Sequence, residues 1–166
     1  FVSVSFTGMV GVVSGMNADG LAVAIQAAGS EASIRPGMPM ALVVREILQH
    51  GSSLEDAEAI LRKRAGTVSE NVMVVDGEAQ EAALFEVTPE TVERLEAGTS
   101  LGVTNHFRTP ALALDRTNQE RVANYTTRHR LARVEELLER HKGGLNPTVA
   151  REILEDRQGL GDTPLP

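Results

Sequence analysis

A hairpin signal near the N-terminus constrains the fold of this chain more than any other feature. Two apolar runs, "MVGVVSGM" and "LAVAIQAA", are joined by "NADG", whose Asp19 and Gly20 suit a tight turn. We therefore expect residues 9–28 to form an antiparallel hairpin that turns at Asn17 to Gly20. The alternating stretch "FVSVSF" in front of it predicts a further strand, so that residues 1–28 hold strands only.

Two helices are predicted after the hairpin, within residues 38–65. Apolar residues between Met40 and Leu48 recur at helical spacing. The second helix is expected to open on Ser52, with Glu55 three residues later in a capping-box pattern, and to close on basic residues. Both helices should be amphipathic and should cover a sheet.

Strands return in residues 71–106, where the pattern predicts a meander of four: "NVMVVDG", "EAALFEVT", "TVERLEA" and "SLGVTNHF". Residues 117–157 are expected to be helical, with one long helix from Thr117 to Lys142 and another that starts at Asn146 and Pro147. The order of strands, helices, strands and helices indicates an α+β fold in one domain rather than alternating βαβ units.

Charge and composition exclude several classes of function. The formal net charge is -7 and the basic residues are interleaved with acidic ones, so nucleic acid and an anionic membrane are not expected as partners. The chain has no cysteine, which excludes disulfides, thiolate metal sites and a cysteine nucleophile within these residues. His50, His106, His129 and His141 lack metal-ligand spacing, so we expect neither a metal nor another cofactor.

Polar side chains at strand ends are the candidate functional residues. Asn105 and His106 end an apolar stretch, and they either cap the strand or place an amide donor where it can stabilise an oxyanion. Gln26, near the end of "LAVAIQ", is either an outward-facing polar residue or part of a site. Asn17 is expected to serve the hairpin turn.

An ordered set of segments resembles a known family: "GMVGVVSGMNADGLAVAIQ", "RPGMP", "SENVMVVDG", "EVTP", "TNHF" and "TTRHRLARVEELL". The family is that of acyl-coenzyme A:6-aminopenicillanic acid acyltransferase, peptidase family C45, among the N-terminal nucleophile hydrolases. The resemblance implies an αββα sandwich, in which helices cover two sheets. It also implies cleavage or transfer of acyl groups at amide or thioester bonds, by a cysteine that autoproteolysis exposes as the N-terminal residue, with no metal required.

The resemblance assigns roles to three residues. Asn105 of "TNHF" matches the family's asparagine that hydrogen-bonds the oxyanion. Gln26 lies at or beside a position that lines the substrate site, and Asn71 lies where the family has a small polar residue entering the sheet. Both are therefore candidates for substrate binding. His106 is expected to point to the opposite face from Asn105 and to be structural.

The resemblance further implies that the chain is the middle of such an enzyme, incomplete at both ends. The family's nucleophile precedes the hairpin, and a further arginine of the family belongs beyond Pro166. We therefore expect the chain alone to be inactive. Its expected partners are a small acyl-amide or acyl-thioester substrate and the missing segments of its own precursor. The alternative is a noncatalytic domain that uses the same scaffold for binding or assembly.

Overall fold

A single antiparallel sheet organises the described part of the molecule. The computed structural model describes residues 1–64 and 66–157. Its six strands lie in the sheet in chain order, and each pairs antiparallel with the next. The strands are β1 (Val2–Val4), β2 (Ser14–Met16), β3 (Leu21–Ala27), β4 (Glu70–Asp76), β5 (Glu81–Val87) and β6 (Val92–Glu96).

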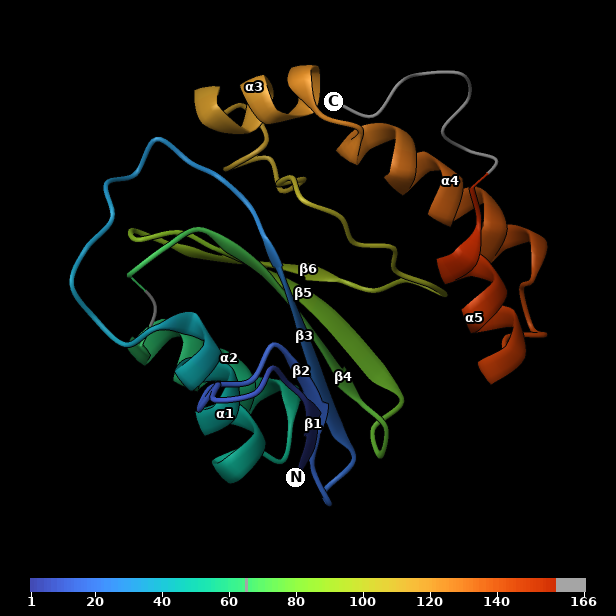
Figure 1. The fold of residues 1–166 in the computed structure, drawn as a ribbon, viewed down its shortest axis with the longest axis horizontal. Coiled ribbons are helices and arrows are strands. Elements are labelled where there is room, and N and C mark those ends of the chain that lie inside the picture. Colours follow the sequence, from blue (N-terminus) through green and yellow to red (C-terminus); the bar gives the residue numbers. More distant parts are fainter. Residues whose placement is uncertain (65, 158–166) are drawn as a thin grey trace.

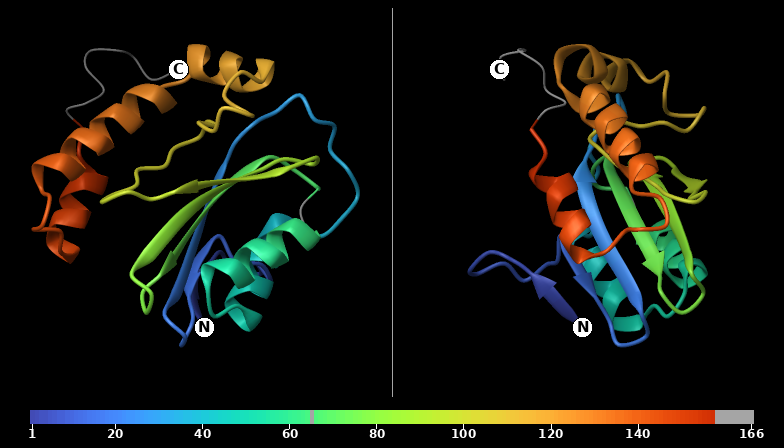
Figure 2. Two further views of the ribbon diagram at one scale, coloured as in Figure 1. Left: turned by 180° about the vertical axis from the view of Figure 1, so that it is seen from behind. Right: turned by 90° about the vertical axis from the view of Figure 1, so that its right-hand side faces the viewer.

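Helices lie on both sides of this sheet. Figure 1 shows two helices below and to the left of the strands and three helices above and to the right of them. The first pair is α1 (Met40–His50) and α2 (Leu54–Arg64). The second group is α3 (Arg116–Asn124), α4 (Thr127–Arg140) and α5 (Pro147–Glu155). Figure 2 shows the same separation from behind and from the side.

The predicted hairpin is confirmed, and its turn runs from Asn17 to Gly20 between β2 and β3. Asn17 Oδ1 accepts hydrogen bonds from the backbone N–H of Asp19 and of Leu21, at 3.1 and 2.9 Å. Gly20 has a φ of 84°, which explains the glycine. β2 is shorter than its apolar run because Val12 donates its N–H to the carbonyl of Ala41 in α1, at 2.8 Å.

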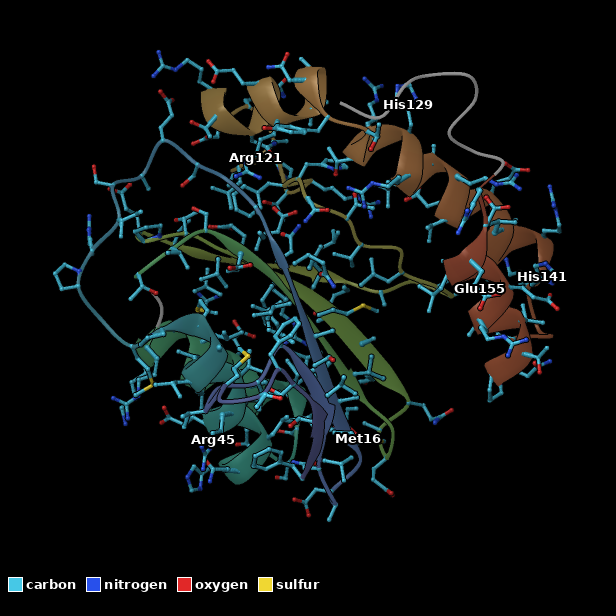
Figure 3. The ribbon with its side chains drawn as sticks, in the orientation of Figure 1. Met16, Arg45, Arg121, His129, His141 and Glu155 are labelled. Carbon is cyan, nitrogen blue, oxygen red and sulfur yellow. The ribbon has the colours of Figure 1, made fainter. Side chains whose placement is uncertain are left out.

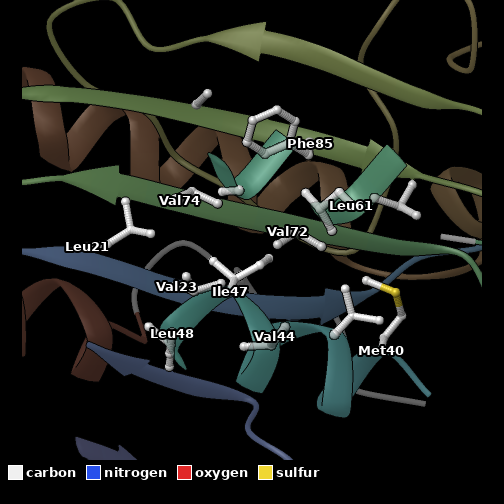
Figure 4. Close-up of a cluster of buried hydrophobic side chains, with 14 of the residues drawn as sticks. Leu21, Val23, Met40, Val44, Ile47, Leu48, Leu61, Val72, Val74 and Phe85 are labelled. Atoms are coloured by element: carbon white, nitrogen blue, oxygen red, sulfur yellow. The ribbon is translucent and has the colours of Figure 1, made fainter. Parts of the chain in front are cut away.

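The hydrophobic core lies between α1, α2 and the near face of the sheet. Side chains alternate along a strand, so every second residue of β3, β4 and β5 reaches these helices. Figure 4 shows how closely the two sets of side chains pack. Members of the core include Leu21, Val23, Val43, Val44, Ile47, Leu54, Leu61, Val72, Val74, Ala83, Phe85 and Val87, each exposed by at most 3%.

The far face of the sheet carries the intervening residues, and in β3, β4 and β5 three of these are polar: Gln26, Asn71 and Glu86. Gln26 pairs with Asn71 across β3 and β4, and Asn71 pairs with Glu86 across β4 and β5. Paired residues of antiparallel strands point to the same face, so these three side chains form a row. The segment 100–115 passes on this side, between the sheet and helices α3 and α4 (Figure 1).

The prediction of a fourth meander strand at "SLGVTNHF" is wrong. Residues 100–106 join no strand ladder and bend at Asn105 and His106, so the meander consists of β4, β5 and β6. The reason is that this segment crosses the face of the sheet instead of lying along its edge. A side chain of the sheet hydrogen-bonds the backbone of this segment: Asn71 Nδ2 donates to the carbonyls of Thr104 and His106, at 2.7 and 3.0 Å.

The prediction of one long helix from Thr117 to Lys142 is also wrong. The chain leaves the helical conformation at Tyr125, whose φ and ψ are -125° and 163°, and α4 starts anew at Thr127. This break allows the Thr127 hydroxyl to reach the buried segment below, where it contacts Thr104 and His106.

The predicted start of the second helix is displaced by one residue. Ser53, not Ser52, caps α2: its hydroxyl accepts from the N–H of Asp56, and the Asp56 carboxylate accepts in return from the N–H and hydroxyl of Ser52. Asp56 thus takes the part expected of Glu55.

The α+β class is confirmed. The described residues supply one sheet with helices on each side, and they do not form the second sheet that a complete αββα sandwich requires. Residue 65, the last of the predicted two-helix region 38–65, and residues 158–166 lie outside the described residues.

Candidate functional site

Asn105 lies where the segment across the sheet meets the end of β3. Its Nδ2 donates to the carbonyl of Ala27 at 2.9 Å, and its Oδ1 accepts from Arg130 Nη2 of α4 at 2.8 Å. Its backbone N–H donates to Thr127 Oγ1, also at 2.9 Å. The amide is therefore held from the sheet and from α4 together. One hydrogen of Nδ2 has no partner among the described residues.

Gln26 and Asn71 each carry a side-chain carbonyl oxygen without a hydrogen-bond donor on the far face. They are direct partners across β3 and β4. Gln26 Oε1 and Asn71 Oδ1 are both buried and accept no hydrogen bond from the described residues. An unsatisfied buried acceptor costs about 1 to 3 kcal/mol, so the pair marks a place suited to a donor from elsewhere.

The structure thus brings together the three residues that the sequence nominated. Asn105 bonds to Ala27, which follows Gln26, and Asn71 holds the carbonyls on either side of Asn105. Asn71 is fully buried and both of its amide hydrogens are used within the protein, so Oδ1 is its one polar side-chain atom without a partner among the described residues.

His106 is turned away from this group. The residue is only 8% exposed, and its Nδ1 lies 2.9 Å from Thr127 Oγ1 and 3.1 Å from Thr104 Oγ1. Its contacts with α4 agree with the structural role expected for it. Burial lowers the pKa of His106, and the positive charges of Arg108, Arg128 and Arg130 lower it further. The neutral imidazole is therefore favoured.

Two residues of this region were not found by sequence reasoning. Arg130 hydrogen-bonds the Asn105 side-chain amide. The sequence feature that could have indicated Arg130 is the run of basic residues in the first turn of a helix. Glu86 is fully buried, and its carboxylate accepts from the backbone N–H groups of Arg108 and Thr109 and from the Thr109 hydroxyl. The sequence feature that could have indicated Glu86 is that it is the one carboxylate within the apolar strand "AALFEV".

Glu86 and Asn71 together fix the course of the segment on which Asn105 lies. Asn71 bonds residues 104 and 106, and Glu86 bonds residues 108 and 109. Both anchors come from neighbouring strands, so Asn105 is positioned by the sheet and not by a free loop.

Other features of the described residues do not add to this site. A cavity of about 570 Å³ lies at the opposite end of β4 and β5, beside Asp76 and Glu81. No group of three or more His, Asp or Glu side chains in the described part is placed to hold a metal ion. None of the described helices has both the length and the apolar character needed to cross a membrane.

Comparison with solved structures shows that the chain shares its fold with an acid amidase and with a bile acid hydrolase. An N-acylethanolamine-hydrolyzing acid amidase ortholog from Caenorhabditis elegans superposes with a TM-score of 0.63 at 11% identity, over 96% of this chain and 69% of that one. An arginine-to-leucine variant of conjugated bile acid hydrolase from Clostridium perfringens gives 0.59 at 16% identity, over 92% and 61%. A cysteine-to-alanine mutant of the same hydrolase gives 0.59 at 16%, over 97% and 64%.

These structures share the fold at low identity, and the chain spans 61% to 69% of their lengths. A comparison with curated protein sequences gives no match. The sequence model of the acyl-coenzyme A:6-aminopenicillanic acid acyl-transferase family, in contrast, matches residues 1–163. This match covers nearly the whole chain, and the chain therefore belongs to that family.

Proposed function

We propose that this chain is part of an N-terminal-cysteine amidohydrolase or acyltransferase that acts on acyl-amide or acyl-thioester bonds. The observation that carries the proposal is the position of the Asn105 amide, fixed between Ala27 and Arg130 with one N–H left over. The family match and the shared fold support the same class of chemistry.

Asn105 acts in this proposal as the oxyanion donor. When a thiolate attacks the acyl carbonyl, negative charge develops on its oxygen, and a preorganised N–H stabilises that charge. Arg130 strengthens the effect because its guanidinium draws electron density from Oδ1 and fixes the orientation of the amide.

Gln26 and Asn71 supply the complementary acceptors. An acyl amide carries an N–H next to its carbonyl, and Gln26 Oε1 and Asn71 Oδ1, which are buried and without a donor among the described residues, would accept from such a group once the site opens to the substrate. Asn71 also positions Asn105 through the carbonyls that it holds.

The nucleophile comes from outside residues 1–166 in this proposal, because the sequence has no cysteine. Autoproteolysis exposes that cysteine, whose α-amino group takes the thiol proton and returns it to the departing amine or thiol. Water or an acceptor amine then releases the acyl group. The chain by itself has no turnover, since a donor without a nucleophile leaves no covalent path.

The lack of cysteine also favours a second candidate, a noncatalytic domain that keeps the scaffold for binding or assembly. The parent coding sequence separates the two candidates. A cysteine codon some tens of residues upstream of Phe1 is expected for the enzyme, and an open reading frame without one leaves only the noncatalytic domain.

The role of Asn105 is tested in the full-length protein with acyl-amide and acyl-thioester substrates. Asn105→Ala should lower kcat by about 10² to 10³ and change KM much less, as expected for one lost oxyanion donor. Asn124→Ala is the matched control, since Asn124 is an exposed residue at the end of α3. A kcat of Asn105→Ala equal to that of the control would show that Asn105 only caps the segment.

A further inference from the structure

The backbone of residues 104–109, next to the Asn105 amide, is bonded by side chains from more than one element. Asn71 and Glu86 reach it from the sheet. A further side chain, that of Asn118 in the first turn of α3, reaches it from the helices. Asn118 Oδ1 accepts from the N–H of Phe107 at 2.8 Å, and Asn118 Nδ2 donates to the carbonyl of Phe107 at 3.1 Å. One asparagine thus bonds both backbone polar groups of a residue that joins no strand.

The side chain of Asn118 is fully used within the protein. The residue is 1% exposed, and Nδ2 also donates to the carbonyl of Ala113 at 3.2 Å. Asparagine favours a helix less than most residues do, and a buried amide is costly without hydrogen-bond partners. The presence of asparagine at position 118 is therefore explained by its bonds to Phe107 and Ala113, which lie outside α3.

Phe107 lies two residues after Asn105, and its own side chain is also fixed. The ring is buried in one apolar cluster with Ala28. Ala28 directly follows Ala27, whose carbonyl accepts from Asn105 Nδ2. The bonds from Asn118 and the burial of the ring therefore hold residue 107 in the same region as the Asn105 amide.

Helix α3 is itself packed against the chain that leaves β3. Figure 3 shows Arg121, three residues after Asn118 in α3, on the side of the helix that is turned toward the strands. A Cβ atom at Gly29 would overlap the Arg121 side chain, so the helix lies directly against the backbone there. A bond from α3 to Phe107 therefore places residues 104–109 relative to the end of β3, to which Asn105 is bonded.

We propose that Asn118 is a positioning residue for acyl transfer, which rests on the proposed role of Asn105 as the oxyanion donor. Such a donor is effective only when it is held within about 0.5 Å of its productive position. The Asn105 N–H is bonded to Thr127 of α4, and Asn118 fixes both backbone groups of Phe107. Without Asn118, the segment keeps its bonds to the sheet but loses the contact with α3 that sets its position on this side.

Asn118 does not touch the substrate in this proposal, because its oxygen and both amide hydrogens already have partners. A change at this position should therefore act on kcat and not on KM. A residue that only stabilised the fold would change neither constant as long as the protein stays folded.

The test compares Asn118→Asp with Asn124→Asp in the full-length protein, with acyl-amide substrates. Aspartate keeps the shape of asparagine and an acceptor for the Phe107 N–H, but it cannot supply two N–H groups to the carbonyls of Phe107 and Ala113. Asn118→Asp should lower kcat by about 10- to 100-fold with little change in KM, because a displacement of about 1 Å can cost this much. Asn124→Asp is the matched control at an exposed position of α3 and should change neither constant.

A double variant separates positioning from loss of stability. In the background of Asn105→Ala, Asn118→Asp should lower kcat further by less than about twofold, because the residue through which it acts is gone. Ile47→Val lowers stability in the core on the other face of the sheet and should leave kcat unchanged while the protein is folded. A further loss as large as that in the single variant, or a kcat of Asn118→Asp equal to that of Asn124→Asp, would overturn the proposal.

A measurement without turnover separates failure of this proposal from failure of the proposed function. In the ¹⁵N-labelled protein, the order parameter of the Asn105 Nδ2 group should fall in Asn118→Asp and stay unchanged in Asn124→Asp. An unchanged order parameter in Asn118→Asp would overturn the proposal whatever its kcat. If Asn105→Ala keeps its full kcat, the oxyanion role of Asn105 fails, and the order parameter alone decides whether Asn118 positions the amide. If Asn118→Asp does not fold, Asn118→Ser, which is smaller and uncharged, undergoes the same measurements with the same expected results.

Discussion

Burial of His106 couples the protonation of one side chain to the folding of the whole chain. Its pKa in the folded state is lowered by burial and by the arginines around it, so the folded protein binds a proton less readily than the unfolded chain. Stability is thus unaffected above the unfolded pKa of about 6.5 and falls as pH drops below that value toward the folded pKa.

The expected result is a smaller free energy of unfolding at pH 5.5 than at pH 7.5, measured by urea denaturation. His106→Gln removes the titrating group and should flatten this part of the pH profile. His141→Gln serves as the control, because His141 lies at the C-cap of α4 and is not fully buried. A profile of His106→Gln as steep as that of the unchanged chain would contradict the assignment.

For single residues, the sequence could indicate Asn105 as a candidate site residue but could not predict its hydrogen-bond partners. A polar pair after an apolar run indicates that something bonds it, and the family resemblance singles out the asparagine. The partner of its Oδ1, Arg130, lies 25 positions away and on a different element. Contacts of this kind depend on the tertiary path of the chain, and spacing within a segment does not contain that information.

Among the elements, the segment 100–109 shows why a local pattern can mislead. Its apolar run reads as a strand, but a strand needs a free edge to pair with. The backbone of this segment instead finds its partners in Asn71 and Glu86, which project from the middle of the sheet. The hairpin and the helices α1 and α2 were predicted well because their turn residues, spacing and caps are local. The break between α3 and α4 was missed because it is set by the contact of Thr127 with the buried segment.

Replacement of Glu86 by glutamine should loosen this segment. The carboxylate accepts three hydrogen bonds, and an amide NH₂ in place of one oxygen would face N–H groups that it cannot bond. We expect a loss of about 1 to 3 kcal/mol in the free energy of unfolding, with faster hydrogen exchange at Arg108 and Thr109. Glu93→Gln is the control, since Glu93 is the partner of Glu86 on β6 and is less buried. Equal stability of the two variants would mean that Glu86 does not anchor the segment.

The whole molecule is held together differently on its two sides. The near face of the sheet packs on α1 and α2 through a large apolar cluster. On the other side lies the far layer, which consists of the segment 100–115 and helices α3 to α5. Within the described residues, the buried apolar cluster that joins this layer to the end of β3 consists of Ala28, Phe107 and Leu112. The far layer is joined to the sheet mainly by polar side chains such as Asn71 and Glu86. Apolar burial is the dominant stabilising contribution to folding, so the two sides should differ in stability.

We therefore predict that helices α3 to α5 open before the sheet does. In native-state hydrogen exchange, amides of α3, α4 and α5 should exchange through an opening of lower free energy and weaker urea dependence than amides of β3, β4 and β5. Ile47→Ala, in the middle of the near core, should lower the free energy of global unfolding by about 2 to 5 kcal/mol and speed exchange in the strands. Exchange in α3 to α5 should stay unchanged in this variant, because their opening leaves the near core intact. If Ile47→Ala accelerated exchange equally in both sets of amides, the two layers would form one cooperative unit.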